Sequence, residues 1–70
     1  MNIKVFGATI TDSNKADYLL SMLRINIADA LIYIDIQENK TLYKIEVNRD
    51  ITEVVHGLFS TQGLFVKEYK

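Results

Sequence analysis

The side chains of this chain that could do chemistry are few and widely spaced. The sequence contains no cysteine, one histidine (His56) and two methionines. A soft cation such as Cu(I) therefore lacks the thiolate donors that it requires. A single histidine without neighbouring ligands is more typical of a surface position than of a metal centre. The sequence predicts no metal site and no cofactor.

Groups that could catalyse a reaction are equally sparse. The chain has no cysteine nucleophile, no histidine with an obvious acidic partner and no glycine-rich phosphate loop. Asp35 and Glu46 fall on adjacent predicted strands and could form a carboxylate pair. A solvated sheet surface balanced by Lys4, Lys44 and Lys67 is the simpler interpretation. We expect a protein without catalytic residues.

One polar segment has the composition of a ligand-binding loop. Residues 8–14 follow the first predicted strand and contain four side chains that could bind a metal or a small molecule, namely Thr9, Thr11, Asp12 and Ser13. The same residue types also begin helices, because their side-chain oxygens accept hydrogen bonds from the first free amides. Asp12 or Ser13 is the expected helix cap, so the segment is either a ligand loop or a helix start.

The composition indicates one folded domain over residues 1–70. Hydrophobic residues make up 49% and charged residues 24% of the chain, which is enough apolar surface for a core and is not typical of disorder. The net charge of −1 provides no field that would attract nucleic acid or an anionic membrane. No signal-peptide pattern or apolar run of about 18 residues is present. We expect a cytoplasmic protein that does not bind membranes.

The hydrophobic periodicity predicts six secondary-structure elements. Alternating apolar residues predict strands over residues 2–9, 30–36, 41–47 and 64–69. Helical spacing predicts a first helix that ends near Asn26 and a second helix with an apolar stripe from Ile51 to Phe59. Asp50 and Glu53 should begin the second helix as a capping box, and Gly63 should end it. This order predicts a ferredoxin-like α+β sandwich, in which a four-stranded antiparallel sheet has both helices on one face and its first and third strands at the centre.

The chain resembles the heavy-metal-associated domain of copper chaperones and metal-transporting ATPases. That family carries Val-x-Gly-Met-Thr-Cys-x-x-Cys at the end of its first strand, and this chain has Val5-x-Gly7-Ala8-Thr9-Ile10-x-x-Ser13. The resemblance extends to the buried positions of the first helix and to Gly63 with the strand that follows it. It implies the ferredoxin-like fold. Because Ile10 and Ser13 replace both cysteines, the family's Cu(I) chemistry is not carried over.

A second resemblance is to the ACT ligand-binding domain, which has the same topology. Gly7 is the candidate for the glycine that this family uses to bind ligands at the first strand–helix junction. The alternative to a protein interface is a divergent metal- or small-ligand-binding domain that uses the loop at residues 8–14.

The sheet face that the helices leave uncovered is the strongest candidate for function. With Ile3 and Val5 assigned to the covered side, alternation assigns a mainly apolar group to the open side: Phe6, Leu31, Tyr33, Leu42, Phe65 and Tyr69. An apolar patch with interleaved lysines is typical of an interface. We expect it to bind a second copy of the chain or another protein.

Three alternatives to this interface remain open. The aromatic residues could stack on unpaired RNA bases, although the chain lacks the Lys/Arg-Gly-Phe/Tyr run of RNA-recognition domains. Strand 30–36 should lie at the sheet edge without a proline, so edge-to-edge pairing could make the dimer. Tyrosines also occur on sheet faces that bind nothing. In addition, one bulge in the last strand would exchange the faces of Phe65 and Val66.

Overall fold

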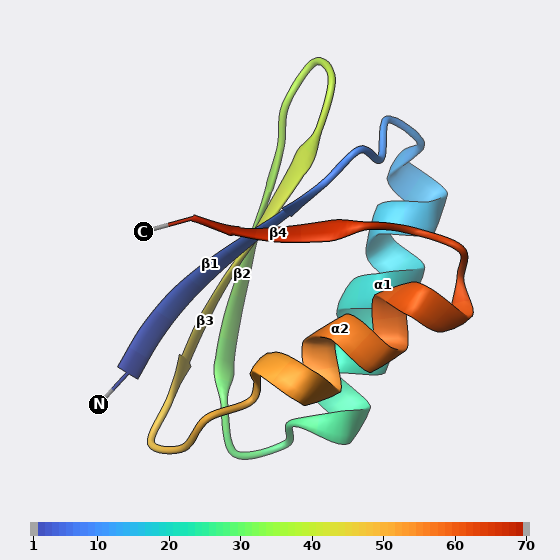
Figure 1. Cartoon of the computed structure of the whole chain (residues 1–70). Helices are drawn as coiled ribbons and strands as arrows, with labels where there is room; N and C mark the ends of the chain where they lie inside the picture. The colour runs from blue at the N-terminus through green and yellow to red at the C-terminus, as the bar shows by residue number, and fades with distance from the viewer. Residues whose placement is uncertain (1, 70) are drawn as a thin grey trace.

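The structure is a computed structural model and describes residues 2–69. Its elements are β1 (Asn2–Ala8), α1 (Ser13–Asn26), β2 (Leu31–Ile36), β3 (Thr41–Val47), α2 (Thr52–Thr61) and β4 (Val66–Tyr69). The strands form one antiparallel sheet in the order β2-β3-β1-β4. Both helices lie on the same side of this sheet (Figure 1). The predicted ferredoxin-like βαββαβ fold is confirmed, with β1 and β3 at the centre and β2 at one edge.

The helix ends follow local hydrogen-bonding rules. Asp12 Oδ1 accepts a hydrogen bond from the Asn14 amide at 2.9 Å, so Asp12 rather than Ser13 caps α1. Helix α1 ends at Asn26, as the sequence predicts. At the end of α2, Gly63 adopts a φ of 70°, a conformation that glycine tolerates best.

The start of α2 differs from the predicted capping box. Asp50 Oδ1 accepts from the amide and the hydroxyl of Thr52, at 3.0 and 2.7 Å, and not from Glu53. Thr52 offers two donors within reach of one carboxylate, so a local turn forms two residues after Asp50 instead.

The core lies between the sheet and the helices. Its residues show that the predicted orientation of β1 is wrong. Phe6 is fully buried on the helix side, whereas the sequence assigned it to the open face. Phe6 pairs directly with Tyr43 on β3, and residues opposite one another on adjacent strands point to the same face. The Tyr43 ring is itself buried, with its centroid 5.4 Å from that of Phe59. Phe6 therefore belongs to the core, and Ile3 and Val5 lie on the open face.

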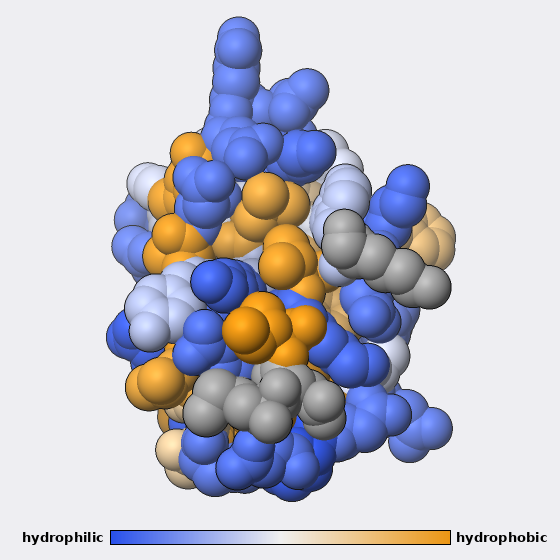
Figure 2. All heavy atoms as spheres, turned by 90° about the vertical axis from the view of Figure 1, so that its left-hand side faces the viewer, coloured by the Kyte–Doolittle hydropathy of each residue, from blue (hydrophilic) through white to orange (hydrophobic). Residues whose placement is uncertain are grey.

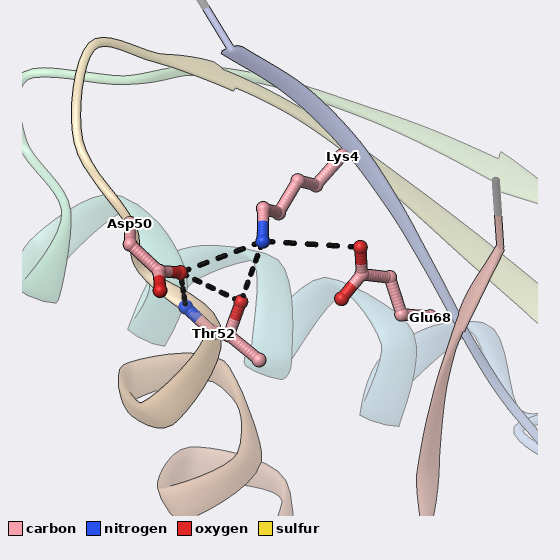
Figure 3. Close-up of polar contacts among 4 residues, drawn as sticks. All are labelled: Lys4, Asp50, Thr52 and Glu68. Atoms are coloured by element: carbon pink, nitrogen blue, oxygen red, sulfur yellow. Dashed lines mark hydrogen bonds and ion pairs between the residues drawn. The ribbon is translucent and has the colours of Figure 1, made fainter.

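Because β1 has this orientation, Lys4 also points to the helix side and not to the open face. Its Nζ donates to Thr52 Oγ1 at 2.9 Å and lies 3.5 Å from Asp50 Oδ1 and 3.8 Å from Glu68 Oε2 (Figure 3). These contacts join β1, β4 and the start of α2. Hydrogen bonds from the Thr52 amide and hydroxyl, and then the charge of Lys4, lower the pKa of Asp50 below its usual 3.8.

This lowered pKa makes the start of α2 sensitive to acid. The folded pKa of Asp50 is below the unfolded value, so its contribution to stability is present above about pH 4 and is lost as the pH falls through the folded pKa. Asp50→Asn keeps an oxygen that accepts from Thr52 but does not titrate. We expect its urea midpoint to fall less than that of the wild type between about pH 5 and about pH 2. Asp17→Asn, at an exposed position on α1, is the control and should behave as the wild type.

Candidate interaction surface on the open sheet face

The strand register arranges the open face in three rows that run across the sheet. The central row contains Tyr33, Lys44, Val5 and Tyr69, from β2 to β4. The row nearer the β2–β3 turn contains Asp35, Leu42, Gly7 and Lys67. The third row contains Leu31, Glu46 and Ile3. We refer to these eleven residues as the open face.

Apolar side chains gather along the middle of this face, with polar ones among and around them (Figure 2). The exposed fractions of Ile3, Leu31 and Tyr33 are 55%, 56% and 53%. Val5 and Leu42 are half-buried. The sequence correctly assigned Leu31, Tyr33, Leu42 and Tyr69 to this side. It missed Ile3 and Val5, which replace Phe6 in the patch.

Gly7 allows the ring of Tyr69 to lie against the sheet. A Cβ atom at position 7 would overlap the Tyr69 ring and would lie 3.0 Å from Leu42. The pairing of β1 with β4 continues from Val5 to Ala8 without a bulge, so Val66 lies on the helix side and Tyr69 on the open side, as predicted.

The open face carries two acidic and two basic side chains. Asp35 is on β2, Lys44 and Glu46 are on β3, and Lys67 is on β4. Lys44 Nζ lies 3.9 Å from Glu46 Oε1 and 5.8 Å from the centroid of the Tyr33 ring. Asp35 accepts from Gln37 Nε2 at 3.2 Å. Asp35 is opposite Leu42 and Glu46 is opposite Leu31, so the two carboxylates lie in different rows and do not form the pair considered from the sequence. Asp35 and Lys67 stand at opposite ends of one row.

The polar segment at residues 8–14 begins α1 and contributes to the core. Thr9, Thr11, Asp12 and Ser13 are exposed, and the Asp12 carboxylate is engaged as the helix cap. Ile10 is buried and its carbonyl oxygen accepts from Thr41 Oγ1 at 2.9 Å. Ile10 therefore packs in the core, at the position where the heavy-metal-associated domain has its first cysteine.

The histidine and the acidic residues do not gather into a metal centre within the described part of the chain. His56 is exposed on α2, and its ring packs edge-on against Phe6 with 6.2 Å between centroids. The structure thus gives His56 a packing contact with the core.

No protein-family model and no curated protein matches this chain. The resemblance to the heavy-metal-associated domain therefore stays a prediction. Of the two helices in the described residues, neither has the length and apolar character needed to cross a membrane.

Proposed function

We propose that this protein is a non-catalytic interaction module that associates with a second copy of itself through the open face. The observation that supports it is the apolar patch in which Ile3, Leu31 and Tyr33 stay more than half exposed. A stable interface buries about 800 Å² on each partner. This is less than a fifth of the 4516 Å² surface, so one face of a two-layer molecule is sufficient.

The resemblance to the heavy-metal-associated domain is part of this proposal. Ile10 and Ser13 supply no thiolate, so we expect a domain of that type in which partner binding, and not transfer of Cu(I), is the activity. The expected compartment is the cytoplasm.

The charges of the open face favour one dimer geometry. Most homodimers have a two-fold axis, which brings the same patch of both copies together. An axis parallel to the strands, midway between β3 and β1, lays β2 of one copy over β4 of the other. Asp35 then faces Lys67 of the second copy, and the same pair forms a second time by symmetry. Leu42 faces Gly7 of the second copy, which the Tyr69 ring of that copy covers, so Leu42 would contact this ring.

A two-fold axis across the strands is disfavoured by the central row. That axis would place Lys44 opposite Lys44 of the second copy, and like charges brought together in an interface are repulsive. With the favoured axis, Lys44 faces Val5 and keeps its contact with Glu46. Facing sheets cross at about 30°, which shifts edge residues by a few ångströms, within the reach of a lysine side chain.

A charge exchange tests this geometry. Asp35→Lys and Lys67→Asp should each weaken the dimer by about tenfold, because each places like charges opposite one another twice. The double variant restores the attraction and should recover most of the affinity. The dissociation constant is measured by light scattering across a dilution series. Lys15→Asp on α1 and Glu53→Lys on α2 make the same changes in net charge away from the open face and should leave the affinity unchanged.

The measurements test self-association and the proposed two-fold axis separately. A wild-type chain that stays at 8.0 kDa up to about millimolar concentration would rule out self-association. A dimer whose affinity is the same in both single variants and the double variant would exclude this axis and favour edge pairing through β2, which does not bring Asp35 to Lys67.

A further inference from the structure

A hollow beside the open face has the shape and charge of a small-ligand site. It has a volume of about 370 Å³ and lies between the end of β1, the turn from β2 to β3 and the start of β4. The residues that matter for its chemistry are Gly7, Asn39, Lys40, Phe65, Lys67 and Tyr69. Ligand pockets begin at about 300 Å³, so the hollow can hold a molecule of the size of a mononucleotide.

Two lysines converge on one aromatic ring at this hollow. Lys40 Nζ lies 4.9 Å and Lys67 Nζ 5.6 Å from the centroid of the Tyr69 ring. Attraction to the ring holds each ammonium group in place. Among the described residues that line the hollow, none carries a carboxylate, and the ion pairs within residues 2–69 involve neither lysine. Both ammonium groups lie within about 6 Å of the same ring centroid, and this positive charge at the hollow favours an anion.

Phe65 adds an aromatic surface to the same hollow. Its side chain is 96% exposed, the highest exposure of any large apolar residue in the described chain. An aromatic ring that packs against almost nothing can stack on a flat ligand. The Asn39 amide and the Tyr69 hydroxyl, at the same site, are groups that can donate hydrogen bonds to a phosphate or a sugar.

We infer that this hollow binds a phosphate ester with a planar ring, of the class of a nucleoside monophosphate. The phosphate lies between Lys40 and Lys67, and the base stacks on Phe65. Gly7 contributes because it leaves the space that the Tyr69 ring occupies, and both ammonium groups lie near this ring. Of the predicted ligand loop, only Thr9 borders this hollow. Asn39, Lys40 and Phe65 lie outside the three rows of the open face, whereas Gly7, Lys67 and Tyr69 belong to both surfaces, so binding is measured at concentrations at which the chain is monomeric.

The test is a titration of the isotope-labelled chain with adenosine monophosphate, followed by nuclear magnetic resonance. The amide signals of Gly7, Lys40 and Lys67 should shift, with a Kd in the range of about 1 mM or below. Adenosine alone and inorganic phosphate alone should each bind at least about fivefold more weakly, since each lacks one of the two recognised groups.

Two pairs of matched variants assign the site. Lys40→Met and Phe65→Ala should each raise the Kd by about fivefold to tenfold. Their controls on α1, Lys15→Met and Ile25→Ala, remove the same kinds of exposed group elsewhere and should leave the Kd unchanged. Lys67, which the hollow shares with the open face, is left intact in all four variants.

Three results would overturn the inference. The first is no change in the spectrum up to about 10 mM nucleotide. The second is Lys40→Met binding as tightly as Lys15→Met. The third is a short RNA oligonucleotide binding about a hundredfold more tightly than the mononucleotide, which would make the site one for a polymer.

Discussion

Phe6→Ala should lower the free energy of unfolding by about 3–5 kcal/mol, because it removes a fully buried ring and leaves a cavity between β1 and α2. A domain of this length has a total stability of roughly 4–10 kcal/mol, so the variant should lose a large fraction of it. Phe65→Ala, at a side chain that is 96% exposed, should change the stability by less than about 0.5 kcal/mol.

Urea unfolding followed by far-ultraviolet circular dichroism measures both variants. Phe6→Leu provides a milder change if Phe6→Ala does not fold, and it should still cost more than Phe65→Ala. Equal effects at positions 6 and 65 would mean that β1 presents Phe6 to solvent, as expected when Ile3 and Val5 are assigned to the covered side, and would contradict the structure.

Tyr43 should make the protein unfold in alkali. Burial, and then the charge of Asp17, raises the pKa of Tyr43 from 10.0 to about 12. Its hydroxyl is fully buried and donates to the Ala16 carbonyl at 2.9 Å. Because the folded pKa is the higher one, the unfolded chain loses the proton first. The contribution to stability is complete below pH 10 and decreases as the pH rises to the folded pKa, by about 3 kcal/mol in total.

The matched variant is Tyr43→Phe, which has no proton to lose. It should cost about 1 kcal/mol at neutral pH through the missing hydrogen bond, and its stability should fall less steeply than that of the wild type above about pH 10. Urea midpoints between neutral pH and about pH 12 measure the difference. Tyr33→Phe, at a half-exposed ring on the open face, should keep the wild-type dependence. An equally steep fall in Tyr43→Phe would show that other groups, such as the lysines, cause alkaline unfolding.

The sequence was sufficient to predict the fold because most elements carry an unambiguous pattern. The run around Ile32 and Ile34 alternates with polar or aromatic residues, and the helices have one apolar stripe each. Strand order then follows from the right-handed crossover rule. The end of α1 at Asn26 is a local signal that the sequence predicts, whereas the sequence narrows the cap only to Asp12 or Ser13.

The orientation of β1 could not be predicted in the same way. Ile3 and Val5 on one side, and Phe6 and Ala8 on the other, are all apolar, so alternation does not decide which side is buried. The pairing of Phe6 with Tyr43 decides it, and that register depends on tertiary structure. One feature of the sequence bears on the orientation of β1. A glycine leaves room for an aromatic ring from the neighbouring strand, so Gly7 would lie on the same face as Tyr69, which was assigned to the open face.

The hollow beside β4 was also beyond sequence reasoning. Lys40 and Lys67 are far apart in the chain and lie near the same Tyr69 ring because β4 returns beside β1. The polar loop at residues 8–14 was the more visible candidate, yet its best ligand, Asp12, is engaged in capping α1.

The short final strand has a consequence for the dynamics of the protein. β4 is four residues long and lies at the sheet edge, where it pairs only with β1. Short edge elements open locally at a lower free energy than the rest of a domain. Lys67 and Tyr69 both belong to β4, so each local opening of this strand removes one charge from the open face and the central ring from the hollow. The stability of this one strand, as measured by amide hydrogen exchange, therefore sets the fraction of molecules that are competent for either kind of binding.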